Sequence, residues 1–342
     1  MKILVTGGLG FIGSNFIRHV LATQADAQIV NLDIQTYAGN PENLKDIAGD
    51  KRYFWVQADI TDPALVGRAM SGADAVVHFA AESHVDRSIL DPGPFLKTNV
   101  IGTQVLLDAA RLEKIKKFIH VSTDEVYGSI PGKRRSTEKD GLFPNSPYAA
   151  SKAASDCLAR AAFVTHQLPV IITRASNNFG PYQYPEKALP LMITNFFEGK
   201  TYPLYGDGLN VRDWLYVKDH VAALAYILKE GTPGEIYNIG GDTSLKNKEL
   251  VLKVREIMKI PPSLVARVPD RPGHDRRYAL NDSKLRKLGF EFKHSFEEAL
   301  FQTIEWYKTH ESWWQPLKKS GGYAAYYQKQ YKKGTAPFSK LA

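Results

Sequence analysis

The start of the chain places a short apolar run directly before regularly spaced glycines. Residues 2–6 read Lys-Ile-Leu-Val-Thr, glycines follow at Gly7, Gly10 and Gly13, and apolar residues then recur at helical spacing. A strand that enters a helix through such a turn directs backbone N–H groups and the helix N-terminus toward a pyrophosphate. The first glycine interval is wider than in the usual Gly-x-Gly-x-x-Gly turn. The pattern still predicts a dinucleotide-binding strand, turn and helix.

Apolar and helical segments then alternate along the first half of the chain. Further strands are predicted at 28–32, 53–57, 74–79, 117–121 and 170–173, with helices at 91–112 and from 147 onward. This spacing is typical of an α/β protein with a Rossmann-type, doubly wound parallel sheet. We expect residues 1–178 to form this NAD-binding domain, with residues of about 211–230 returning to it. Residues 179–342 are expected to form a smaller, interleaved substrate-binding domain, because loops rich in Pro, Tyr and Gly at 181–190 and 202–208 interrupt the alternation.

Composition favours a cytoplasmic protein. The chain is 44% hydrophobic and 23% charged, and it begins without a signal-peptide pattern or any apolar run long enough to span a membrane. The single cysteine, Cys157, excludes an internal disulfide, and its position in an Ala-rich segment predicts simple packing. The net charge of +8 comes from scattered basic residues, so we expect no nucleic-acid partner. No metal site is predicted.

Two polar features follow predicted strands. Asp33 comes directly after the second strand, where a carboxylate can bind the ribose hydroxyls of NAD and would repel the 2′-phosphate of NADP, although a turn residue is the simpler alternative. Thr123, Asp124 and Glu125 come directly after the strand at 117–121. Ligand-binding and catalytic residues are common at the carboxyl ends of such strands.

Tyr148 and Lys152 lie at positions i and i+4 of a predicted helix, and therefore on one face. A positive charge beside a phenol favours its anion, so the pair predicts a tyrosine that acts as a base near neutral pH. Taken alone, the pair also fits a packed aromatic ring and a solvated lysine. The segment 270–277 is the densest basic turn of the chain, which suits phosphate recognition but also fits a solvated charge run.

In combination, these features resemble the extended short-chain dehydrogenase/reductase family, and within it the nucleotide-sugar 4,6-dehydratases. The resemblance runs from Met1 to about Trp314 and includes the segments at 121–128, 212–217 and 270–278. The acid pair after the strand is its specific part, because related sugar epimerases usually keep the tyrosine and lysine without it. The resemblance implies NAD as cofactor, a homodimer and a place in deoxysugar biosynthesis such as the dTDP-rhamnose pathway.

The resemblance also implies a lyase reaction, dehydration of dTDP-glucose to dTDP-4-keto-6-deoxy-glucose. Tyr148, helped by Lys152, would take the 4-hydroxyl proton as hydride passes to NAD. Glu125 would then remove the C5 proton, and Asp124 would protonate the departing 6-hydroxyl before hydride returns to C6. Thr123 would hydrogen-bond the sugar near O4.

The resemblance further implies two sets of binding residues. The cofactor set comprises Gly7, Gly10, Phe11, Ile12, Gly13, Asp33, Ile34, Gln35, Thr36, Asp59, Ile60, Ala80, Ala81, Glu82, Ser83, Thr98, Tyr148, Lys152 and Asn178. The nucleotide-sugar set comprises Ser83, Thr123, Asn177, Lys187, Ala188, Pro203, Tyr205, Arg212, Asn247, Arg271 and His274.

Three alternatives remain open at this point. The protein could dehydrate another nucleotide sugar, it could be an epimerase of the same family, or it could be a dinucleotide sensor that has lost its chemistry. The acid pair argues against the epimerase, and the complete set of reactive residues argues against the sensor. The aromatic, Lys-rich segment from Gly321 onward has no predicted role.

Overall fold

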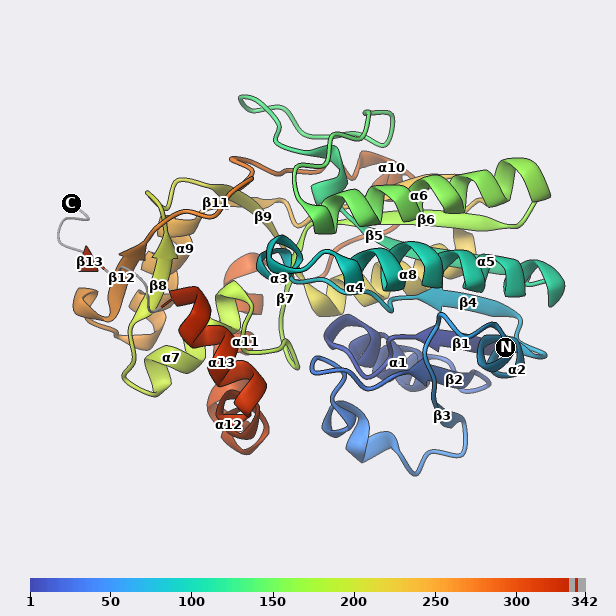
Figure 1. Ribbon diagram of the computed structural model, residues 1–342, viewed down its shortest axis with the longest axis horizontal. Coiled ribbons are helices and arrows are strands. Elements are labelled where there is room, and N and C mark those ends of the chain that lie inside the picture. Colours follow the sequence, from blue (N-terminus) through green and yellow to red (C-terminus); the bar gives the residue numbers. More distant parts are fainter. Residues whose placement is uncertain (332–335, 338–342) are drawn as a thin grey trace.

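The computed structural model describes residues 1–331 and 336–337, and its centre is a parallel sheet with the order β3-β2-β1-β4-β5-β6-β10 (Figure 1). Its strands are β1 (Lys2–Thr6), β2 (Gln28–Asp33), β3 (Tyr53–Gln57), β4 (Ala75–His78), β5 (Lys117–Thr123), β6 (Val170–Ala175) and β10 (Ile236–Ile239). The predicted doubly wound α/β fold is therefore confirmed. The strand order reverses between β1 and β4, and in such sheets ligands bind at this point, beyond the carboxyl ends of the strands.

Helices cover both faces of the sheet, as the strand sequences require. α1 (Phe11–Thr23) and α8 (Val217–Glu230) pack together on one face, while α2 (Pro63–Met70), α5 (Thr103–Leu112) and α6 (Pro147–His166) cover the other. In β1, Ile3 and Val5 join the core under α1, and Leu4 joins the core under α2 and α5. A strand buried on both faces reads as a continuous apolar run, which is why these strands could be predicted.

The segment that leads into α5 differs from the single helix predicted at 91–112. It contains α3 (Val85–Leu90), α4 (Gly93–Phe95) and a π-helical stretch, η2 (Leu96–Gly102), before α5 begins. Pro92 precedes α4, and helical geometry is disfavoured for the residue before a proline, here Asp91. The helical run therefore starts later than predicted. Two short 3-10 helices complete this half, η1 (Pro41–Ile47) and η3 (Asp124–Tyr127).

A smaller lobe, drawn on the left in Figure 1, carries two three-stranded sheets, β11-β9-β7 and β13-β12-β8. Their strands are β7 (Asn177–Phe179), β8 (Tyr202–Tyr205), β9 (Val211–Tyr216), β11 (Thr243–Lys246), β12 (Val265–Val268) and β13 (Ala336–Pro337). The helices of this lobe are α7 (Ala188–Phe197), α9 (Asn247–Met258), η4 (Pro262–Leu264), α11 (Phe296–Thr309), α12 (Glu311–Lys319) and α13 (Gly321–Tyr331), whereas α10 (Ser283–Lys287) packs on β10 of the large sheet.

Two local predictions were wrong. The loop predicted at 202–208 begins with strand β8, because Tyr202 and Leu204 are buried and the segment pairs with β12. Cys157 is exposed rather than packed, since it lies on the side of α6 that faces away from the sheet, whereas Ala159 is buried against it. Among the described residues, no helix combines the length and apolar character needed to cross a bilayer.

Candidate active site

The glycine turn between β1 and α1 is held too closely for side chains. Gly7 has a φ of 71°, and a Cβ there would lie 2.6 Å from the backbone nitrogen of Ala80. A Cβ on Gly13 would lie 2.4 Å from the carbonyl oxygen of Gly7. The turn thus needs glycine for its conformation and for close packing of α1, which are the requirements of a pyrophosphate cradle.

Asp33 closes this cradle at the end of β2. Its carboxylate accepts hydrogen bonds from the backbone N–H groups of Leu9, in the glycine turn, and of Gln35, at 2.9 and 2.8 Å. A buried carboxylate fixed beside the turn fits the ribose of a dinucleotide. Other residues of the predicted cofactor set follow the carboxyl ends of neighbouring strands: Gly10, Phe11 and Ile12 lie at the start of α1, Ile34 and Thr36 follow β2, Asp59 and Ile60 follow β3, and Ala80, Ala81, Glu82 and Ser83 follow β4.

Thr98 and Asn178 come from outside these strand ends. Thr98 lies in η2 beside Asn99, which the predicted set omits. The Asn99 side chain accepts from the backbone N–H of Glu82 and donates to its carbonyl, both at 2.9 Å, so it fixes the loop after β4. The Asn178 Oδ1 atom, in β7, accepts a hydrogen bond from His220 Nδ1 at 2.8 Å. No sequence pattern indicated the role of Asn99, because that role depends on its burial in η2 next to the loop after β4.

Tyr148 and Lys152 are both buried on α6, next to the end of β5. Lys152 Nζ donates to the carbonyl of Val121 at 2.9 Å, and burial lowers the lysine pKa to about 8. Burial, followed by the nearby Glu125 carboxylate, raises the pKa of Tyr148, and a hydrogen bond with Thr123 only partly opposes this. That Lys152 makes Tyr148 a ready base stays a prediction, since burial of the phenol opposes its ionisation.

Asp124 and Glu125 form the first turn of η3, directly after β5. The Thr123 hydroxyl donates to Asp124 Oδ1 and accepts from the Glu125 backbone N–H, both at 3.3 Å. Burial and then Glu125 raise the pKa of Asp124 well above its ordinary value. Burial also raises the pKa of Glu125, but Arg271 and Arg212 counteract it, so the two carboxyls have different electrostatic environments.

A cavity of about 160 Å³ lies between η3 and the smaller lobe. Its lining includes every residue of the predicted nucleotide-sugar set except Thr123, namely Ser83, Asn177, Lys187, Ala188, Pro203, Tyr205, Arg212, Asn247, Arg271 and His274. Glu125 also lines it. The structure therefore gathers side chains from η3, β7, α7, β8, β9, α9 and the basic turn at 270–277 around one small volume.

The basic side chains of this cavity are held by the protein. Arg212 donates to the carbonyl of Asp275 at 3.0 Å, and Lys187 donates to that of Ser83 at 2.8 Å. His274 Nδ1 lies 2.5 Å from Asp270 Oδ1, and burial with nearby Arg271 lowers the histidine pKa to about 4.

Asp86 is the main residue of the cavity that the sequence did not identify. It accepts from Arg271 Nη1 at 3.0 Å, from the Tyr205 hydroxyl at 2.9 Å and from the Tyr326 hydroxyl at 3.2 Å. Tyr331, at the end of α13, also lines the cavity. The aromatic segment without a predicted role thus packs on the nucleotide-sugar site, and nothing local in the sequence shows which distant residues it meets.

Several buried polar atoms of the site have no hydrogen-bond partner in the described part of the chain. They are Asp124 Oδ2, Asn177 Oδ1 and Arg271 Nε. Because buried polar groups are normally paired, these atoms point to a polar ligand in the cavity.

Comparison with known proteins gives a consistent result. The protein family described as GDP-mannose 4,6 dehydratase matches residues 4–303. A dTDP-glucose 4,6-dehydratase of Streptomyces niveus is 49% identical over 93% of this chain and 96% of its own length. The dTDP-glucose 4,6-dehydratase 1 of Escherichia coli K12 is 47% identical over 97% of this chain and 99% of its own. The chain belongs to the nucleotide-sugar 4,6-dehydratases of the extended short-chain dehydrogenase/reductase family.

A solved 4,6-dehydratase has the same fold. DesIV of Streptomyces venezuelae, a dTDP-glucose 4,6-dehydratase crystallised with NAD, is 50% identical and superimposes with a TM-score of 0.91 over 93% of this chain and 100% of its own. The family resemblance inferred from the sequence is thus confirmed.

Proposed function

We propose that the protein dehydrates dTDP-glucose to dTDP-4-keto-6-deoxy-glucose with bound NAD. The observation that carries this proposal is that Asp124 and Glu125 are two adjacent carboxyls in unequal environments, next to the Tyr148–Lys152 pair. Elimination of water needs one carboxyl as acid and one as base, and unequal environments separate their roles. An epimerase has no need of such a pair.

The different surroundings assign the roles. Asp124, whose pKa is raised most strongly by burial and by Glu125, is the protonated acid for the 6-hydroxyl leaving group. Glu125, near Arg271 and Arg212, is the ionised base for the C5 proton. The C5 proton becomes acidic only after C4 is oxidised, so the carboxyls act second.

Tyr148 acts first, as the acceptor of the 4-hydroxyl proton. Thr123 forms a hydrogen bond with Tyr148 and stabilises the sugar oxygen at C4. NAD, when bound, supplies the oxidation at C4 by accepting a hydride that it later returns to C6. The glycine turn with Asp33 holds the cofactor, together with the other residues of the predicted set, and the positive charge of a nicotinamide favours the phenolate that the protein's own groups disfavour.

The nucleotide diphosphate is bound by the basic cavity. Arg212 and Arg271 suit bidentate recognition of phosphate oxygens, and Lys187 adds a point charge. Residues 1–178 with 211–230 act as the NAD-binding part, and residues 179–342 as the interleaved sugar-nucleotide part. dTDP-glucose is the substrate because the relatives that share about half of the positions are dTDP-glucose 4,6-dehydratases.

A cytoplasmic homodimer completes the proposal. Apolar side chains remain exposed on α5, on α6 and on the π-helical stretch before them: Leu96, Ile101, Leu112 and Val164. Such a face on two adjacent helices suits association with a second copy.

The purified protein with its bound NAD should be incubated with dTDP-glucose, UDP-glucose and GDP-mannose in parallel. We expect dTDP-glucose to lose one water and give a 4-keto sugar, with much slower turnover of the other two. Preferred dehydration of GDP-mannose would replace the substrate assignment, and epimerisation of UDP-glucose without loss of water would refute the dehydratase.

A further inference from the structure

The reactive carboxyls have few contacts of their own. Asp124 Oδ1 meets only the Thr123 hydroxyl among its protein hydrogen-bond partners in the described residues, and Asp124 Oδ2 has none. Glu125 faces the cavity. The placement of both side chains therefore depends on the backbone of η3, and on whatever fixes that turn.

The fixed point of η3 is its last residue, Tyr127. Its ring is buried, with only 4% exposed, and its hydroxyl accepts from Arg174 Nη1 at 2.9 Å and donates to Asn238 Oδ1 at 2.8 Å. The Arg174 guanidinium carbon also lies 4.8 Å from the centroid of the Tyr127 ring. One phenol thus joins η3 to β6 and β10, the two strands that follow β5 toward the edge of the sheet.

The Arg174 side of this contact leads to the Tyr148–Lys152 helix. Arg174 Nε donates to Asp156 Oδ2 at 2.8 Å, and both side chains are almost fully buried. Asp156 lies one turn after Lys152 on α6. The turn that carries the acid pair is therefore connected, through buried polar contacts, to the helix that carries the tyrosine.

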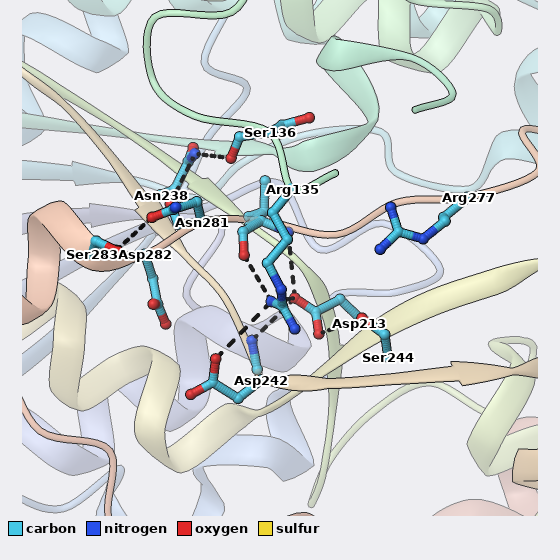
Figure 2. A network of polar contacts seen from close by, with 12 residues as sticks. Arg135, Ser136, Asp213, Asn238, Asp242, Ser244, Arg277, Asn281, Asp282 and Ser283 are labelled. Atoms are coloured by element: carbon cyan, nitrogen blue, oxygen red, sulfur yellow. Dashed lines mark hydrogen bonds and ion pairs between the residues drawn. The ribbon is translucent and has the colours of Figure 1, made fainter. Parts of the chain in front are cut away.

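The Asn238 side leads to two chain segments that pair behind η3. Asn238 Nδ2 donates to the carbonyls of Ser136 and Asn281 at 3.0 and 3.3 Å, as Figure 2 shows. The two segments also bind each other, since Arg135 Nη1 donates to the Leu280 carbonyl at 2.8 Å. Arg135 lies 3.6 Å from Asp213 of β9 in the same network (Figure 2). Tyr127 is thus held by two side chains, Arg174 and Asn238, that lie opposite each other on the paired strands β6 and β10.

We propose that Tyr127 is a positioning residue that fixes the Asp124–Glu125 turn for the elimination step. The proposal rests on the proposed function. Without the hydroxyl, the Arg174 N–H and the Asn238 oxygen would lie unpaired in the interior, and η3 would shift or admit water to pair them. Small displacements of a reacting group are costly, so elimination should suffer. Tyr148 and Lys152 stand on α6, which Asp156 and Arg174 still connect to β6, so oxidation should continue.

The test is a single-turnover comparison of Tyr127→Phe with the wild type on dTDP-glucose. Absorbance of reduced nicotinamide reports the oxidation stage, while product mass and solvent deuterium at C5 report elimination. We expect elimination to slow tenfold to a hundredfold, with the oxidation stage changed less than threefold and reduced nicotinamide accumulating. Asn238→Ala, which removes one of the two partners, should give a smaller effect of the same kind, and it serves if Tyr127→Phe does not fold.

Tyr307→Phe is the matched control. Tyr307 is a fully buried tyrosine of α11 whose hydroxyl donates to the Gln183 carbonyl. The control variant therefore loses a buried, hydrogen-bonded phenol hydroxyl, as Tyr127→Phe does. Its ratio of the two stages should equal that of the wild type, and thermal unfolding of all variants reports stability separately. Equal slowing of both stages by Tyr127→Phe, or no slowing, would overturn the positioning role. A wild type that converts no dTDP-glucose would instead refute the proposed function.

Discussion

The Tyr148–Lys152 pair and the Asp124–Glu125 pair are close neighbours beside β5, but burial affects their reactivity in opposite ways. Tyr148 and Lys152 stand on a helix, buried in an environment that keeps the phenol protonated and lowers the lysine pKa to about 8. Asp124 and Glu125 stand on a short turn, where burial raises both pKa values, the nearby Glu125 raises that of Asp124 further, and Arg271 and Arg212 partly oppose the rise for Glu125. In each pair, desolvation is the largest contribution to the pKa shifts, and it results from the burial of these side chains in the fold.

The consequence differs between the pairs. A raised pKa impairs a base, so Tyr148 depends on an added positive charge before it can accept a proton. A raised pKa equips an acid, so Asp124 is ready without any ligand. The Tyr148–Lys152 pair can therefore react only when the cofactor is bound, whereas the Asp124–Glu125 pair can react only after the sugar has been oxidised.

The largest effect is expected for Tyr148→Phe, which removes the first base. Without it no ketone forms, so both stages should fall by about 10³ to 10⁴. Single-turnover absorbance of reduced nicotinamide and product mass measure the two stages. Elimination without detectable oxidation would break the proposed order.

Glu125→Gln should separate the pairs. The oxidation stage should survive within a few-fold, while elimination slows by about 10² to 10³ because the C5 base is lost. Reduced nicotinamide should accumulate after mixing with dTDP-glucose, with little deuterium at C5. If this variant abolished oxidation as completely as Tyr148→Phe while still binding substrate, the division between the pairs would be wrong.

The pH dependence of elimination should show both carboxyls. Glu125 must be ionised, and its pKa is raised above the ordinary 4.5, so the rate should fall on acidification at a pH above that value. Asp124 must be protonated, and its raised pKa means that the rate falls again as pH rises through it. The two limbs belong to the interacting pair. Asp124→Asn should remove the alkaline limb from a single-turnover profile; a limb that persists would belong to another group.

The smallest effect is expected for Arg271→Ala, which removes a charge near Glu125 but no reacting group. Loss of a diphosphate contact, made equally in ground and transition states, should raise KM about tenfold and leave kcat within about twofold. Steady-state kinetics measure both constants. A loss confined to kcat would place Arg271 at the reacting sugar.

Sequence reasoning found the features that local pattern determines. The strands, the glycine turn and the pair Tyr148 and Lys152 depend on apolar runs and fixed spacings, and the structure has the predicted elements. The sign of the Tyr148 pKa shift could not be predicted, because it depends on how deeply the fold buries the phenol. Asp86 could not be recognised either, since its partners Arg271 and Tyr326 are far away in the chain.

The same distance in sequence explains why α13 had no predicted role. The role of its aromatic residues becomes clear only from their contacts with Tyr205, His84 and Asp86 in the folded protein. The resemblance supplied the cavity residues, because a shared motif carries three-dimensional information that composition and periodicity lack.

The position of α13 has a practical consequence for handling the protein. Met1 lies at the amino ends of the strands, where its amino group donates to the Asp26 carbonyl at 3.1 Å, whereas α13 ends at Tyr331 on the wall of the sugar-nucleotide cavity. Figure 1 shows Met1 on the right, at the large sheet, and α13 to the left, in the smaller lobe. An affinity tag or fluorescent fusion on the amino end therefore starts away from the cavity that Tyr331 lines.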